Sequence, residues 1–342
     1  MTIKIIMRRL LPLAVLPILL SGKCKNGDDP TPPAQDAGLY HTFSEVAVEM
    51  QALAAQYSNI ANVESIGRSI QGRDLWAIKI TDNISQDESE PAVVFLGCHH
   101  AREWISVDVP FLLAKYVLEH YASEPDIASR VNASEIWIVP MVNPDGHQYS
   151  VTNDRLWRKN RRNNGDGTYG VDLNRNYGYG WGGSGSSGDT YSEIYRGPAP
   201  FSEPESQAVR DFLLAKRPKA LISYHNFSQL VLYPWGYTYD SAPDEASLHA
   251  QAAAMANQVR SVHNVSYTPE QGSDLYLASG ETTDWLYGET RAAAFTIELR
   301  PRSSSPGFEL PESQIVPTFE ENLPAALYLI DQAIAAPTMA TR

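Results

Sequence analysis

The stretch Pro-Ala-Val-Val-Phe-Leu-Gly-Cys-His-His-Ala-Arg-Glu-Trp, residues 91–104, decides how this chain of 342 residues is interpreted. Its first seven residues are almost continuously apolar, which is typical of a strand buried on both faces of a sheet. The polar residues His99, His100 and Glu103 follow this strand at once. Sites in open α/β sheets gather at strand ends, so we expect chemistry at this junction.

Three further apolar runs have the same character, and helical patterns lie between them. The runs occupy residues 135–142, 220–224 and 294–299, and the helical patterns occupy residues 105–122, 202–217, 244–263 and 319–336. Within the second helical pattern, Ser202 and Glu205 have the spacing of a capping box. Strands that alternate with helices predict an α/β fold with helices on both faces of the sheet. We expect one domain, residues 39–338.

The composition excludes some classes of protein. The chain has 27 Lys+Arg against 40 Asp+Glu and a formal net charge of −13. A nucleic-acid-binding protein would need a basic face, so no nucleic-acid partner is expected. The hydrophobic fraction of 43% is ordinary for a globular protein.

The N-terminal segment has the pattern of an export signal. Basic residues precede an apolar run at residues 10–20 that contains two prolines and is too short to span a membrane. We predict a signal peptide at residues 1–23, with a buried N-terminal helix as the alternative.

A proline-rich, polar stretch at residues 24–38 follows and predicts a tether. Cys24 stands where bacterial lipoproteins carry their lipidated cysteine, although Lys23 departs from the usual small residue before it. Membrane attachment through a lipidated Cys24 and release as a secreted or periplasmic protein therefore both remain open. Either way, we expect an exported bacterial protein.

His100 and Glu103 are candidate metal ligands, because their spacing lets an imidazole and a carboxylate converge on one cation. A catalytic zinc site needs a third protein ligand and keeps a further position for water. His225, at the end of the run at residues 220–224, is the candidate. His99 competes with His100 for the first position. An isolated His-x-x-Glu can also be a structural histidine beside a surface glutamate.

Residues 178–188 (GYGWGGSGSSG) are unusually rich in glycine. They lack the spacing of a phosphate-binding loop, and no strand leads directly into them. We predict a mobile surface loop.

Several motifs in order resemble those of one enzyme family. The motifs are HHAREW (99–104), NPDG (143–146), RLWRKNRR (155–162), GVDLNRNYG (170–178), YRGPAPFSEPE (195–205), YHNFSQ (224–229), LYLASGETTDW (275–285) and FTIELR (295–300). Through them the chain resembles the zinc metallocarboxypeptidases of the pancreatic carboxypeptidase A and B type, including bacterial members of broad specificity. The resemblance implies a single domain with a mixed, mostly parallel, twisted central sheet of about eight strands and helices on both faces.

The resemblance also implies a cofactor and its ligands. His100, Glu103 and His225 match the residues that hold one Zn²⁺ per chain, a His₂Glu set known for carboxypeptidase A. Asp172 matches a carboxylate that orients the first ligand histidine.

Two matched residues carry the chemistry that the family performs. Glu298 matches the general base that takes a proton from the zinc-bound water attacking the last peptide bond. It lies in an apolar strand, where a carboxylate is costly without a partner or a function. Arg158 matches the cation that stabilises the developing oxyanion.

The substrate-binding residues are also implied by the resemblance. Asn174 and Arg175 match the pair that binds the terminal carboxylate of the substrate, Arg102 matches a further cation of the cleft, and Tyr276 matches a mobile tyrosine that closes over the bound terminus.

The side-chain pocket departs from the better-known relatives. Thr283 stands where they carry an apolar or an acidic residue, and Glu281 replaces the glycine of the pancreatic A type. We expect hydrophobic and basic C-terminal residues to be accepted. Alternatively, Glu281 simply begins a helix over residues 282–289.

The function implied is that of an exported, monomeric zinc metallocarboxypeptidase acting on the C-termini of peptides and proteins. One alternative is a carboxypeptidase of cell-wall muropeptides, although the intact Asn-Arg-Asn motif and Tyr276 favour ordinary peptides. The other is a non-catalytic peptide-binding protein. Such a protein would have lost a ligand or the base, whereas every matched position is filled here.

Overall fold

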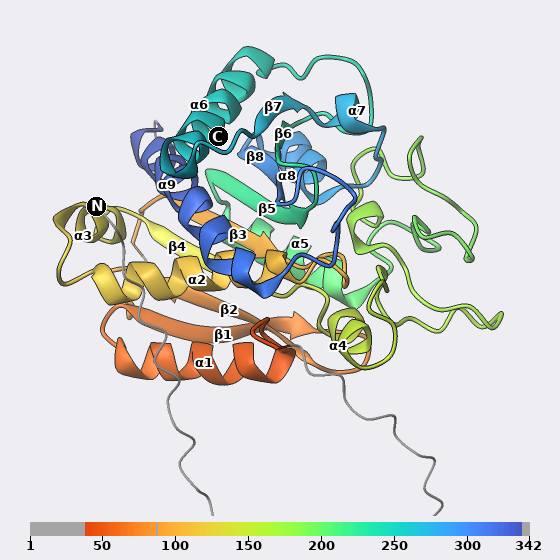
Figure 1. The fold of residues 1–342 in the computed structure, drawn as a ribbon, viewed down its shortest axis with the longest axis horizontal. Coiled ribbons are helices and arrows are strands. Elements are labelled where there is room, and N and C mark those ends of the chain that lie inside the picture. The colour runs from red at the N-terminus through yellow and green to blue at the C-terminus, as the bar shows by residue number, and fades with distance from the viewer. Residues whose placement is uncertain (1–37, 87, 337–342) are drawn as a thin grey trace, which may run out of the picture. The chain divides into compact units, whose positions relative to one another are not determined.

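In the part of the chain that the structure describes, eight strands form one sheet in the order β1-β2-β4-β3-β5-β8-β6-β7 (Figure 1). The structure is a computed structural model, and it describes residues 38–86 and 88–336. The strands are β1 (Ala61–Arg68), β2 (Asp74–Ile80), β3 (Ala92–Gly97), β4 (Glu135–Val139), β5 (Ala220–Asn226), β6 (Leu230–Tyr233), β7 (Thr268–Gln271) and β8 (Ala293–Leu299).

The centre of the sheet is parallel and its flanks are mixed. Strands β4, β3, β5 and β8 run parallel, whereas β2 is antiparallel to β4 and β6 is antiparallel to β8. Strands β3, β4 and β5 are buried at every residue, as their continuous apolar runs predict. The prediction of a mixed, mostly parallel sheet is confirmed.

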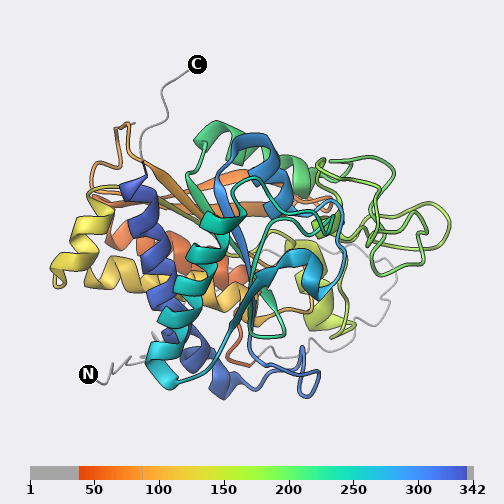
Figure 2. The ribbon, with the colours of Figure 1, turned by 90° about the horizontal axis from the view of Figure 1, so that it is seen from above.

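Helices cover both faces of the sheet (Figures 1 and 2). One face carries α2 (Ile105–His120), α6 (Glu245–His263) and α9 (Ile315–Ala335), which contact the strands, and α9 also packs against α2 and α6. The other carries α5 (Pro204–Lys216) and α8 (Thr282–Thr290). The remaining α-helices are α1 (Phe43–Gln56), α3 (Pro125–Val131), α4 (Pro144–Thr152) and α7 (Gly272–Leu275), and the 3₁₀ helices are η1 (Leu173–Arg175) and η2 (Glu312–Gln314).

The predicted capping box at Ser202 and Glu205 is wrong. Helix α5 begins at Pro204, its N-cap residue is Glu203, and no side chain caps it. Proline favours the first helical position because its fixed φ suits a helix start. The Glu205 carboxylate instead accepts the backbone N–H of Ile70 (3.0 Å), so it serves a tertiary contact.

The parallel register brings distant segments of the chain together at one edge of the sheet. Gly97, the last residue of β3, pairs with Tyr224 of β5, and His225 of β5 pairs with Glu298 of β8. The loop after β3 and the ends of β5 and β8 therefore meet, which is where the candidate site lies.

The predicted signal peptide, Cys24 and all but the last residue of the predicted tether lie outside the described residues. Within residues 38–86 and 88–336, no helix has the length and apolar character needed to cross a membrane.

Candidate active site

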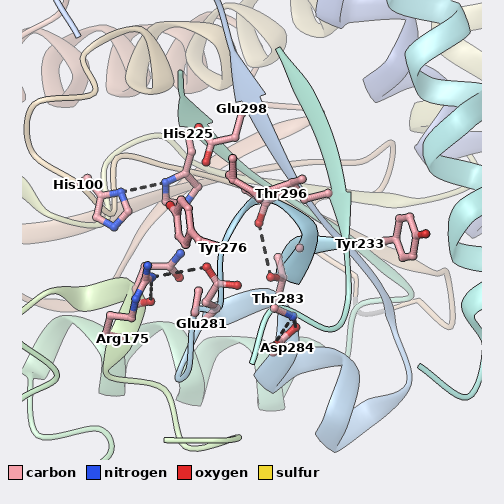
Figure 3. A pocket seen from close by; sticks show the side chains of 16 residues that line it. His100, Arg175, His225, Tyr233, Tyr276, Glu281, Thr283, Asp284, Thr296 and Glu298 are labelled. Carbon is pink, nitrogen blue, oxygen red and sulfur yellow. Dashed lines mark hydrogen bonds and ion pairs between the residues drawn. The ribbon is translucent and has the colours of Figure 1, made fainter. Parts of the chain in front are cut away.

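Three side chains meet at the ends of β3 and β5. Nδ1 of His100 lies 2.8 Å from Oε1 of Glu103, Nδ1 of His225 lies 3.0 Å from Oε2 of Glu103, and the two Nδ1 atoms are 3.1 Å apart. All three side chains are buried. Figure 3 shows the imidazoles of His100 and His225 facing each other.

The hydrogen-bond partners of the two imidazoles make these three residues suited to a metal ion. Nε2 of His100 lies 3.1 Å from Oδ1 of Asp172, and Nε2 of His225 lies 3.1 Å from the hydroxyl of Ser223. With a metal ion bound and both Nε2–H groups donating, each imidazole would be neutral and would direct its Nδ1 lone pair at the ion that it shares with the Glu103 carboxylate. Tetrahedral zinc bonds of about 2.0–2.1 Å place donor atoms roughly 3.3 Å apart, so the donor set fits this ion.

His99 does not belong to this group of metal-ligand candidates. Its Nε2 is 2.9 Å from the hydroxyl of Tyr177 and 2.9 Å from the hydroxyl of Thr282. Cys98 adopts a φ of 56°, a left-handed conformation at the turn after β3. Of the two histidines, it is His100 that the structure groups with Glu103 and His225.

Asp172 connects His100 to Arg158. The Arg158 guanidinium donates to Oδ2 of Asp172 through Nε (3.0 Å) and Nη2 (2.8 Å), while Oδ1 faces His100. Burial alone would raise the pKa of Asp172, but Arg158 and His100 hold it well below its usual range. Nη1 of Arg158 lies 4.0 Å from Glu103. The Asp172 carboxylate thus orients both a histidine and an arginine.

Glu298 lies on β8 beside His225 and lines the same pocket as His100 and His225 (Figure 3). Its backbone pairs with that of His225, which brings its carboxyl group into the same pocket as the imidazole. Burial, together with the nearby charges of Glu103 and Glu281, raises its pKa well above the usual range. Among the described residues, no side-chain hydrogen bond to Glu298 is observed, so this carboxyl group is available for chemistry.

Asn174, Arg175 and Tyr276 line the same pocket. The Arg175 side chain is only 2% exposed, and its guanidinium lies 5.8 Å from the ring centre of Tyr276. Tyr276 is 48% exposed, which places a large aromatic ring at the mouth of the pocket.

The inner part of the pocket contains acidic and hydroxyl side chains. Thr283 and Thr296 approach to 3.5 Å through their hydroxyls. Glu281 lies 3.5 Å from Arg175, and burial raises its pKa to about 8 (Figure 3). Burial also raises the pKa of Asp284, to about 7, although its carboxylate accepts the backbone N–H groups of residues 236 and 237.

Sequence reasoning missed Asp284 and Thr296. Thr296 stands two residues before Glu298 in a strand, so alternation places both side chains on the same face. Asp284 lies one helical turn after Glu281, and residues three apart share a helix face. The alternation of a strand and the three-residue spacing of a helix could therefore have identified Thr296 and Asp284 from the sequence.

Arg102 is placed apart from the residues that line this pocket. Its Nη1 donates to the carbonyl of Leu156 (3.3 Å) and lies 3.5 Å from Glu193. Its guanidinium stacks 4.2 Å from the ring centre of Phe308. Arg102 therefore interacts with a backbone carbonyl and an exposed carboxylate at the outer edge of the site.

A buried His-Glu-His donor set beside a free carboxyl group is typical of a metal-dependent hydrolase. Residues 46–325 match the family model described as zinc carboxypeptidase. The chain is 38% identical over 291 residues to carboxypeptidase B of Astacus astacus, covering 82% of this chain and 93% of that protein. It is 39% identical over 301 residues to a zinc carboxypeptidase of Saccharothrix mutabilis subsp. capreolus, covering 85% and 68%.

A solved structure agrees with these sequence matches. The crystal structure of thrombin activatable fibrinolysis inhibitor superposes with a TM-score of 0.82 at 34% identity, covering 86% of this chain and 75% of that one. The chain therefore belongs to the zinc carboxypeptidase family. It is a zinc-dependent metallocarboxypeptidase, a hydrolase that acts at the C-termini of peptides, as the sequence motifs implied.

Proposed function

We propose that this enzyme removes single C-terminal residues from peptides and proteins, with its zinc ion held by His100, Glu103 and His225. The observation that carries the proposal is the convergence of three lone-pair donors at 2.8–3.1 Å beside Glu298. In this proposal Asp172 fixes the orientation of His100 through Nε2, as metal-bound imidazoles usually require.

When bound, zinc supplies Lewis acidity that polarises a carbonyl and makes water a better nucleophile near neutral pH. The charge of a cation on the donor set would favour the ionised form of Glu298, which then accepts the proton of the attacking water and passes it to the departing amine. Its buried position beside His225 supports this role, because a carboxyl group held in an apolar strand without a partner needs a compensating function.

Arg158 stabilises the negative charge that develops on the carbonyl oxygen. Two of its nitrogens are engaged by Asp172, and the remaining terminal nitrogen, Nη1, lies on the side of Glu103. A guanidinium held in this way needs little reorganisation during the reaction, which is what makes fixed positive charges effective.

Exopeptidase action requires recognition of the terminal carboxylate. We assign this to Asn174 and Arg175, which we call the carboxylate clamp, with Tyr276 covering the bound residue. Both clamp residues line the pocket that contains Glu298, and arginine can bind a carboxylate in a bidentate manner. Arg102, at the outer edge, contacts the more distant part of the substrate.

The pocket favours broad specificity for the residue removed. Glu281 is the N-cap residue of α8 but makes no capping hydrogen bond, and its carboxyl group faces Arg175 instead. A neutral Glu281 beside Thr283 tolerates an apolar side chain. When ionised, Glu281 attracts a basic one. The preference is tested on paired peptides ending in Phe and in Arg. Rates that differ by more than about 10³-fold would exclude mixed specificity.

The catalytic role is tested with Glu298→Gln, using the exposed Glu289→Gln as the matched control. We expect Glu298→Gln to retain zinc and to lose about 10²–10⁴-fold in rate, the usual contribution of a general base. Glu289→Gln should behave as the wild type. Full activity of Glu298→Gln would refute the assignment of the base.

The same preparation separates the proposed substrate from cell-wall material. Release of one terminal residue from an ordinary peptide, and none from the same peptide with an amidated terminus, is the expected result. Cleavage of a muropeptide without cleavage of ordinary peptides would favour the cell-wall alternative.

Export remains part of the proposal on sequence grounds. We assign residues 1–23 to a signal peptide, 24–38 to a tether and 39–338 to the catalytic domain of a monomer. Mass measurement of the mature N-terminus distinguishes a lipidated Cys24 from a free one. If lipidation anchors the enzyme, Cys24→Ser releases it from the membrane fraction.

A further inference from the structure

Two groups with no assigned role, the carbonyl of Gly185 and the side chain of Thr282, contact the carboxylate clamp. Nε of Arg175 donates to the carbonyl oxygen of Gly185 (2.8 Å), and Nη1 donates to the carbonyl oxygen of Asn174 (2.7 Å). Among the described residues, Nη2 of Arg175 makes no hydrogen bond that the structure shows. The guanidinium is therefore held through Nε and Nη1, and its Nη2 group is available for a carboxylate.

Gly185 belongs to the glycine-rich segment that the sequence suggested to be a mobile surface loop. Its φ is +76°, and a Cβ there would lie 1.6 Å from the carbonyl oxygen of Leu277. The neighbouring carbonyl of Ser184 accepts a hydrogen bond from Ser279 (2.6 Å). This part of the loop packs directly on the segment that follows Tyr276, and a side chain at position 185 would push the two apart.

The amide of Asn174 is held from α8 by Thr282. Its Oδ1 accepts both the backbone N–H (3.0 Å) and the hydroxyl (3.1 Å) of Thr282. With Oδ1 directed at the helix start, the Nδ2 donors face away from it. The Thr282 hydroxyl also lies 2.9 Å from Nε2 of His99, which can donate to it and leave the hydroxyl proton for Asn174.

We infer that Gly185 and Thr282 are positioning residues that orient Arg175 and Asn174 for the terminal carboxylate of the substrate. The inference rests on the proposed role of the clamp. Side chains ordered before binding lose less conformational freedom when the substrate arrives, so preorganisation strengthens binding. Neither residue is expected to affect the chemical step.

Thr282→Val tests the contact with Asn174, because it removes the hydroxyl and keeps the shape of the side chain and the backbone N–H. We expect KM for a peptide with a free terminal carboxylate to rise about ten-fold, the effect of one hydrogen bond in a charged site, with kcat nearly unchanged. Thr282→Ser restores the hydroxyl and should restore KM. A variant that merely folds less well would lower the active fraction, and hence kcat, instead.

Gly185→Ala tests the contact with Arg175, and Gly182→Ala is its matched control. Gly182 also has a positive φ (+86°), but a Cβ there meets nothing closer than 3.8 Å. Both substitutions introduce the same kind of backbone strain, whereas only Gly185→Ala displaces the carbonyl that holds Arg175. We expect Gly185→Ala to raise KM by about ten-fold or more and Gly182→Ala to leave KM unchanged.

The deciding readout is discrimination between a peptide with a free terminal carboxylate and the same peptide with a terminal amide. A second readout without turnover is the Kd of the free amino acid product, measured by calorimetry. Reduced discrimination and a weaker Kd in Gly185→Ala and Thr282→Val support the inference. Wild-type discrimination in both variants would overturn it. If the wild type itself does not discriminate, the proposed exopeptidase function fails.

Discussion

The metal centre and the side-chain pocket are neighbours, yet their carboxyl groups are in opposite electrostatic situations. Burial disfavours the charge of Glu103, but His100 and His225 lower its pKa below the usual range. Burial also disfavours the charge of Glu281, and the single guanidinium of Arg175 does not compensate for it, so its pKa rises to about 8. The metal centre has its charges matched by fixed partners. The pocket leaves acidic groups for the substrate to match.

The largest effect is expected where the donor set is broken. In His225→Ala, zinc content should fall and kcat/KM should drop by at least about 10³-fold, because the metal contributes several kcal/mol to the transition state. Elemental analysis and peptide release measure the two quantities. His120→Ala, at the end of α2, is the control. A His225→Ala enzyme that keeps zinc and activity would show that the ligands are misassigned.

A smaller effect is expected from substitution of Asp172, which contacts the donor set without belonging to it. Asp172→Asn removes the charge that orients His100 and anchors Arg158. Substitution of a residue that hydrogen-bonds to a metal-bound imidazole typically lowers metal affinity or activity by about 10–100-fold. We therefore expect weaker zinc binding in a chelator competition and a lower kcat. An unchanged zinc affinity together with an unchanged kcat would contradict the role of Asp172.

Substitution of Glu281 in the side-chain pocket should affect some peptide substrates more than others. Above about pH 8, where Glu281 is ionised, Glu281→Gln should lower kcat/KM for a peptide ending in Arg by about ten-fold, the order of one partly screened charged contact. The rate for a peptide ending in Phe should be nearly unchanged, since no charge is needed there. Equal losses on both peptides would indicate that Glu281 supports the structure and does not determine specificity.

The smallest effect is a change of preference with pH. Below about pH 8 the Glu281 carboxyl is protonated and neutral, and above it is ionised. The charged groups around it are Arg175, Asp284, Asp172, Arg158 and Glu298. Because an Arg side chain of the substrate stays charged throughout, the Arg-to-Phe rate ratio should rise as pH increases through about 8. A ratio with the same pH dependence in Glu281→Gln would exclude Glu281 as the titrating group.

The metal centre could be predicted because its signals are local. His100 and Glu103 stand three residues apart directly after a buried strand, and His225 is the last residue but one of another. The choice between His99 and His100 depended on the left-handed turn at Cys98, which a non-glycine residue rarely makes. That conformation is not readable from the sequence, and the family motif resolved the choice instead.

The pocket and the edges of the sheet could be predicted less well. Strand β1 is half-exposed along most of its length, so it lacks the apolar run that marks β3. The contact between Arg175 and Glu281 joins residues 106 positions apart, and the loop that holds Arg175 has the composition of a mobile segment. Such contacts depend on tertiary packing that no local pattern encodes.

Stepwise return of zinc to metal-stripped enzyme is the most direct test of the claim that one zinc ion on His100, Glu103 and His225 drives removal of C-terminal residues. Single-residue release from a free-carboxylate peptide should increase in proportion to added zinc and level off at one ion per chain. Release that persists without metal, or that saturates only at a different stoichiometry, would contradict the account.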